Sequence, residues 1–71
     1  IPTLEFKKEN DKLHFRYTDD CLDGFEMPVK IYDAGQSKWI FPNKSWKSVI
    51  LTMESDVVFD PNFYINTVQL K

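Results

Sequence analysis

The chain has few of the residues that usually carry enzyme chemistry or bind metals. Its 71 residues include one cysteine, one histidine and two glycines. Cys21 has no second cysteine with which to form a disulfide or a cysteine-rich zinc cluster. His14 alone does not supply the two or three nitrogen or sulfur ligands of a zinc site. The two glycines are isolated from each other, so the sequence has no glycine-rich loop for a phosphate.

An excess of charge of one sign and long hydrophobic runs are also lacking. Nine basic residues stand against eleven acidic ones, for a net charge of −2. Basic pairs occur only at Lys7 with Lys8 and at Lys44 with Lys47. Phosphate-backbone binding needs clustered lysine and arginine, so we expect no nucleic-acid partner. No apolar run approaches the ~20 residues of a membrane-spanning helix, so we expect no membrane span.

The sequence does contain enough apolar residues for one small core. Hydrophobic residues make up 42% of the chain, which is too many for a disordered tail. A chain of this length buries one thin core, so residues 1–71 are predicted to form a single domain. Because the sequence starts at Ile1 without an initiator methionine or a charged leader, we expect it to be a piece of a longer protein.

Alternating apolar and polar residues predict a β-hairpin near the start of the chain. Apolar and polar residues alternate over 4–7 and again over 13–18. Between the two runs, residues 9–12 read Glu-Asn-Asp-Lys, and Asn and Asp suit a tight turn because they tolerate positive φ. In the second strand, Phe15 is expected to face the core and His14 to face away from it.

The rest of the chain contains short apolar runs separated by turn residues. Strands are predicted within 25–31, at 39–41, at 57–59 and over 63–70. Proline donates no ladder hydrogen bond, so the first of these strands is expected to begin after Pro28 or to lie at a sheet edge.

Residues 45–53 fit two patterns. Helical spacing is shared by Trp46, Val49, Ile50 and Met53. Strand alternation is shared by Val49, Leu51 and Met53. The β-branched Val-Ile pair within this segment favours the strand. The chain then has about seven short antiparallel strands, and the predicted fold is all-β, a small immunoglobulin-like β-sandwich.

No motif in the sequence predicts catalysis or metal binding. The acidic segment 19–24 resembles a calcium loop, but its third position is Cys21 and its twelfth is Lys30 in place of the bidentate Glu. We therefore predict a solvated turn there. Serine and aspartate accompany the single histidine, yet no nucleophile-elbow pattern surrounds any serine. We expect no catalytic residue, no metal ligand and no cofactor in this chain, which is predicted not to be an enzyme.

The aromatic residues leave two interpretations open. They could fill the core or an interface between domains, or their rings could stack on sugars. The candidates are Tyr32, Trp39, Phe41, Trp46 and Tyr64. Asn43 begins a formal glycosylation sequon, Asn-Lys-Ser, in the same region of the chain.

Two predicted strands have large apolar residues on both of their faces. Trp39 and Phe41 share one side of a strand, and Ile40 takes the other. Near the end of the chain, Tyr64 is expected opposite its apolar neighbours in the same way. One thin core covers one face of a strand, so we expect Trp39, Phe41 and Tyr64 to form a surface that docks on a neighbouring domain.

Four stretches, in their order and spacing, resemble a known domain family. They are Leu-His-Phe-Arg-Tyr at 13–17, Gly-Phe-Glu-Met-Pro-Val-Lys-Ile at 24–31, Trp-Lys-Ser-Val-Ile-Leu at 46–51 and Val-Val-Phe-Asp-Pro-Asn-Phe-Tyr-Ile at 57–65. The pattern is similar to the C-terminal β-sandwich domain of bacterial zinc aminopeptidases of the membrane alanyl aminopeptidase superfamily. The resemblance extends over about residues 4–70.

The resemblance implies a supporting role next to a catalytic domain. The family's catalytic signatures, H-E-x-x-H and G-x-M-E-N, do not occur in this sequence, so no catalytic or zinc-binding residue is carried over. Zinc would belong to the parent protein only, and the partner would be the catalytic domain of the same polypeptide. Parents of this kind commonly carry export signals, which implies a periplasmic or cell-envelope location. The alternative is a carbohydrate- or protein-binding β-sandwich module.

Overall fold

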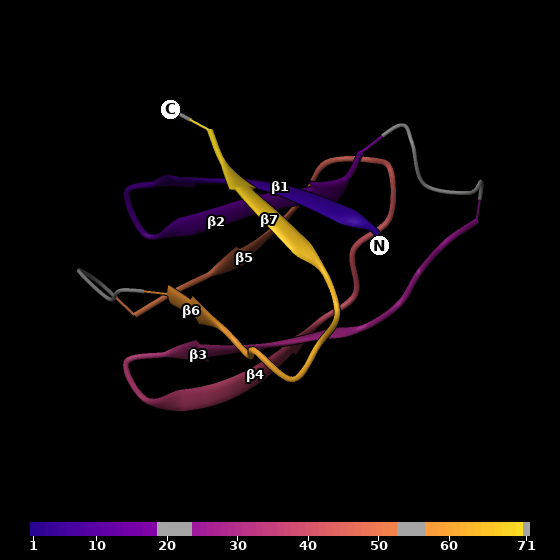
Figure 1. Cartoon of the computed structure of the whole chain (residues 1–71). Helices are drawn as coiled ribbons and strands as arrows, with labels where there is room; N and C mark the ends of the chain where they lie inside the picture. The colour runs from indigo at the N-terminus through magenta and orange to yellow at the C-terminus, as the bar shows by residue number, and fades with distance from the viewer. Residues whose placement is uncertain (19–23, 53–56, 71) are drawn as a thin grey trace.

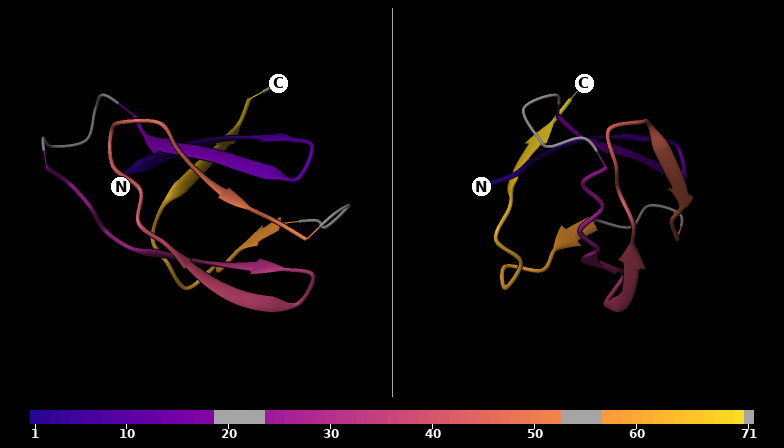
Figure 2. Two further views of the ribbon diagram at one scale, coloured as in Figure 1. Left: turned by 180° about the vertical axis from the view of Figure 1, so that it is seen from behind. Right: turned by 90° about the vertical axis from the view of Figure 1, so that its right-hand side faces the viewer.

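The computed structural model describes residues 1–18, 24–52 and 57–70, and these ranges contain seven strands and no helix. The strands are β1 (Thr3–Glu9), β2 (Lys12–Tyr17), β3 (Val29–Asp33), β4 (Gln36–Ile40), β5 (Lys47–Ile50), β6 (Val57–Phe59) and β7 (Asn66–Gln69). They form a four-stranded sheet of order β5-β2-β1-β7 and a three-stranded sheet of order β4-β3-β6. Figures 1 and 2 show the two sheets as stacked layers. The all-β prediction is confirmed.

Two hairpins follow from local turn chemistry. The predicted hairpin of β1 and β2 is confirmed, and its turn places Asn10 at a φ of 54°. The hairpin of β3 and β4 turns through Ala34 and Gly35, whose φ values of 50° and 84° are both left-handed. A two-residue type I′ turn requires positive φ at both central residues, and glycine adopts it without strain.

The structure also resolves two alternatives that the sequence left open. β3 begins directly after Pro28 and lies in the middle of its sheet, so the proline precedes the ladder and removes no bond from it. Within 45–53, residues 47–50 form β5, which pairs with β2, so the strand prediction is confirmed.

The last strand differs from the prediction in two ways. It comprises only residues 66–69, because 60–65 form the crossing from one sheet to the other. In this crossing, the amide of Phe63 donates to the Asp60 carbonyl (3.2 Å) and the amide of Ile65 to the Phe63 carbonyl (2.9 Å). β7 then pairs parallel with β1, so the expectation that all the strands are antiparallel is wrong. Two parallel strands need a long connection, and here β2 to β6 lie between β1 and β7 in the chain. Apolar patterning alone does not specify the direction in which the last strand joins its sheet.

The core lies between the two sheets and takes residues from both. Its buried apolar members are Leu4, Leu13, Phe15, Tyr17, Val29, Ile31, Ile40 and Leu51. Phe6 on β1 and Phe59 on β6 join the layers through rings whose centroids are 4.8 Å apart. The prediction that Phe15 faces the core is therefore confirmed, and the half-buried His14 lies on the other face of β2.

Candidate functional site

The outer face of the three-stranded sheet carries Trp39, the most exposed aromatic residue in the described strands. Trp39 on β4 is directly opposite Lys30 on β3, and Tyr32 is opposite Val58 on β6. The alternate residues of β3 are buried in the core, so these four side chains point away from it. Trp39 is 51% exposed. We call this surface the Trp39 face, with Phe63 as its fifth member.

Phe63 packs on this face although no feature of the sequence singled it out. Its ring meets the indole of Trp39 edge-on, with centroids 5.3 Å apart. Ile65 instead packs against the core, so these two residues do not share a side as their alternation suggested. The turn after β6 brings Phe63 back over the sheet, and that contact depends on the path of the chain through the crossing. Its only signal in the sequence was its place in an apolar run.

The other two residues predicted for docking are also exposed. Tyr64 follows Phe63 in the crossing and is 80% exposed, the largest exposed fraction of any large hydrophobic residue in the described ranges. Phe41 follows the end of β4 and is exposed as well. Trp39, Phe41 and Tyr64 thus all have accessible rings, and the aromatic contact of the Trp39 face joins Trp39 to Phe63.

A polar group lies at the border of the Trp39 face. The Tyr32 hydroxyl donates to Asp60 Oδ2 at 3.0 Å, and the amide of Asn62 donates to Asp60 Oδ1 at 2.8 Å. The Asn62 amide, with help from the Tyr32 hydroxyl and Lys30, holds the pKa of Asp60 below its ordinary value. The same bond to Asp60 raises the pKa of Tyr32.

We expect this carboxylate to make stability depend on pH in the acid range. Because the pKa of Asp60 is lower in the folded chain than in the unfolded one, its charge stabilises the fold above the ordinary value of about 3.8. That contribution is lost as the pH falls through the folded value. Asp60→Asn should therefore lower Tm at neutral pH, and the gap from the parent chain should close on acidification. A gap in Tm that stays constant from neutral to strongly acid pH would contradict this.

The second exposed tryptophan lies on the outer side of the other sheet. Two cations lie over the ring of Trp46: the guanidinium carbon of Arg16 is 5.0 Å from the ring centroid, and Nζ of Lys7 is 5.5 Å from it. Arg16 also pairs with Glu5 at 3.3 Å. Cations at this distance are held by the ring quadrupole. Trp46 is thus engaged within its own sheet, and a sugar would have to compete with these cations for the ring.

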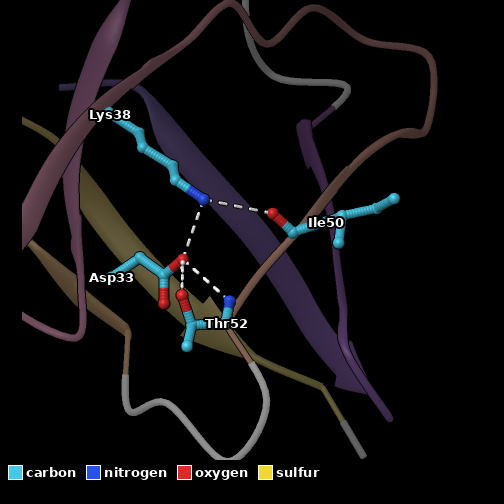
Figure 3. Close-up of polar contacts among 4 residues, drawn as sticks. All are labelled: Asp33, Lys38, Ile50 and Thr52. Atoms are coloured by element: carbon cyan, nitrogen blue, oxygen red, sulfur yellow. Dashed lines mark hydrogen bonds and ion pairs between the residues drawn. The ribbon is translucent and has the colours of Figure 1, made fainter.

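A buried ionic cluster connects the two sheets (Figure 3). The carboxylate of Asp33, at the end of β3, is fully buried. Its Oδ2 accepts from Lys38 Nζ at 2.8 Å, from the Thr52 amide at 2.9 Å and from the Thr52 hydroxyl at 3.2 Å. Lys38 Nζ also donates to the Ile50 carbonyl at 3.3 Å. All three bonds to the carboxylate converge on Oδ2 and join β3 and β4 to the segment that follows β5, so the cluster acts as a structural link.

The described ranges offer no set of ligands for a metal ion. No group of three or more His, Cys, Asp or Glu side chains within them could hold one. The solvated turn predicted for the acidic loop, including Cys21, lies at residues 19–23, outside the described residues. Asn43 of the sequon is half-buried and its Oδ1 accepts from the Ser45 amide at 2.9 Å. No helix of the described part of the chain has the length and hydrophobicity to cross a membrane.

Comparison with known proteins found no relative. No family model, no curated protein and no solved structure matches the chain.

Proposed function

We propose that this chain is a non-catalytic accessory domain, an immunoglobulin-like β-sandwich that packs on the catalytic domain of a zinc-dependent aminopeptidase. The observation that carries the proposal is the Trp39 face, together with the exposed rings of Phe41 and Tyr64. A small domain that exposes large aromatic side chains on one sheet has a surface suited to burial against another domain.

The composition of this face resembles that of a protein–protein interface. Aromatic residues are enriched at the centre of interfaces, and polar residues surround them. Here Trp39 and Phe63 form an aromatic pair, and the charged Lys30 lies directly opposite Trp39 on the neighbouring strand. The edge-on contact with Phe63 restrains the indole before any partner arrives, so little side-chain entropy is lost on docking.

The identity of the partner follows from the sequence resemblance. The pattern over about residues 4–70 is similar to a domain that accompanies a zinc aminopeptidase catalytic domain in one polypeptide. In that arrangement the chain stabilises the architecture around a cleft that lies in the partner. Zinc and the reacting groups belong to the partner, and the periplasm or cell envelope is the proposed location.

The coding sequence upstream of Ile1 tests this assignment. We expect an in-frame H-E-x-x-H motif with a downstream Glu, since these residues bind zinc and activate water in such peptidases. An upstream coding region without this motif would contradict the assignment to an aminopeptidase. It would not contradict docking of the Trp39 face on some other domain.

A carbohydrate-binding module is the second candidate, because Trp39 and Tyr64 present accessible rings. Tryptophan fluorescence separates the two functions. Under the accessory-domain proposal, titration with soluble oligosaccharides leaves the emission of the chain unchanged. A saturable shift that Trp39→Ser removes and Trp46→Ser preserves would favour the carbohydrate-binding module.

A further inference from the structure

We propose that the free edge of β7 is a self-association site, at which two copies of this chain pair their β7 strands antiparallel. The four edge strands of the two sheets are β5 and β7 in one, and β4 and β6 in the other. An edge strand presents unpaired N–H and C=O groups to other chains, and proteins protect such edges with inward-pointing charges or short strands.

Three of the four edges carry such protection. Lys38 on β4 is in register with the buried Ile31, so it points inward, and its Nζ reaches the Ile50 carbonyl of β5. Lys47 on β5 is in register with the buried Phe15, and its Nζ donates to the Phe41 carbonyl at 2.7 Å. The two lysines therefore connect the edges of β4 and β5 across the gap between the sheets. β6 has only three residues.

β7 has neither an inward-pointing lysine nor the three-residue length of β6. It reads Asn-Thr-Val-Gln, carries no charge and no proline, and all four residues are exposed. Its bonds to β1 include those from the Asn66 amide to the Pro2 carbonyl (2.9 Å) and from the Leu70 amide to the Phe6 carbonyl (2.7 Å). Backbone groups alternate in direction along a strand, so the N–H and C=O groups of Thr67 and Gln69 point away from β1. In the described ranges no strand pairs with that side.

The sequence of β7 is complementary to itself. A two-fold axis at Val68 places Thr67 opposite the partner's Gln69 and Gln69 opposite the partner's Thr67. Each of these is a hydrogen-bonded pair, and together they form four backbone bonds. On the outer face Val68 meets the partner's Val68, an apolar cross-strand pair, and Thr and Gln pair on the inner face. Because β7 carries no charge, this register brings no like charges of the two strands together. The contact is short, so the dimer is expected to depend on concentration.

Light scattering coupled to size exclusion tests the proposal with one variant and a matched control. The unsubstituted chain should shift from a mass of 8.4 kDa towards twice that value as its concentration rises. Val68→Lys places two ammonium groups opposite each other and should keep the chain monomeric at every concentration. Ile50→Lys is the control, because Ile50 is also an exposed β-branched residue on an edge strand (66% against 44% for Val68) and lies outside the Trp39 face, and it should dimerise like the unsubstituted chain. Circular dichroism melts establish that both variants are folded.

Amide hydrogen exchange gives a second measurement, which uses the unsubstituted chain and so does not depend on whether a variant folds. Exchange at Thr67 and Gln69 should slow as the concentration of the parent chain rises, whereas exchange in β2 should not change. A parent chain that stays at the monomer mass up to its solubility limit would overturn the proposal. So would a dimer that Val68→Lys leaves intact. Neither result bears on docking through the Trp39 face, which lies on the other sheet.

Discussion

Replacing Phe15 with alanine is expected to unfold most of the chain. Phe15 is 2% exposed, lies on the central strand β2 and is in register with Phe6 on one side and Lys47 on the other. Emptying a packed aromatic site costs about 3–5 kcal/mol, because the cavity adds to the lost transfer free energy. A domain of this size has a free energy of unfolding of about 5 kcal/mol. The expected loss is therefore most of the free energy of unfolding of the chain.

Phe41→Ala is the matched control, since it removes the same atoms from an exposed ring. We expect Phe41→Ala to change the free energy of unfolding by less than about 1 kcal/mol. Both effects are measured by thermal and urea unfolding followed by circular dichroism. A Tm for Phe15→Ala within a few degrees of the parent value would show that the core does not depend on this ring.

The second large effect is expected at the buried ionic cluster. Lys38→Met removes the cation from the buried carboxylate of Asp33 and also removes the bond to the Ile50 carbonyl. Removing one partner of a buried ion pair costs about 3–5 kcal/mol. Because Lys38 itself is partly exposed and pairs partly in solvent, we expect the lower end of that range, about 3 kcal/mol.

Lys12→Met provides the comparison, because Lys12 is an exposed lysine at the start of β2. Its substitution should change the free energy of unfolding by less than about 0.5 kcal/mol. Urea unfolding of the two variants measures the difference directly. If Lys38→Met proves as stable as the parent chain, the cluster does not hold the sheets together.

Local patterns in the sequence predict the parts of the fold that local chemistry determines. The hairpin at 9–12 follows from alternation on both sides of an Asn-Asp turn, and the start of β3 follows from Pro28. β-branched residues favoured a strand within 45–53, and β5 is there. In each case the deciding interactions lie within a few residues of one another.

Contacts between distant residues account for what the sequence did not predict. β7 pairs parallel with β1, although more than 55 residues separate the two strands in the chain. Its direction depends on how the crossing at 60–65 passes between the sheets. The link between Asp33 and Thr52 depends on the same three-dimensional arrangement, since neither residue type is unusual in its own segment.

The sequence predicted only part of the candidate site, because the rest depends on a contact between residues that are distant in the chain. Apolar residues on both sides of one strand indicated that Trp39 would be exposed, and it is. The aromatic partner of Trp39 is Phe63, which lies 24 positions later in the sequence (63 − 39 = 24). Only the turn through Asp60 and Asn62 brings that ring onto the sheet.

The docking proposal is tested most directly by Trp39→Ser, introduced both into this chain and into the full-length parent protein. In the isolated chain the variant loses the edge-on ring contact, worth about 1 kcal/mol, together with the burial of the covered part of the indole. In the full-length protein it also removes the indole from the interface, so urea unfolding should show a larger loss in the free energy of unfolding there than in the isolated chain. Trp46→Ser, on the opposite sheet, should lower the free energy of unfolding equally in both proteins. A Trp39→Ser loss that is the same in both proteins, or larger in the isolated chain, would contradict docking through the Trp39 face.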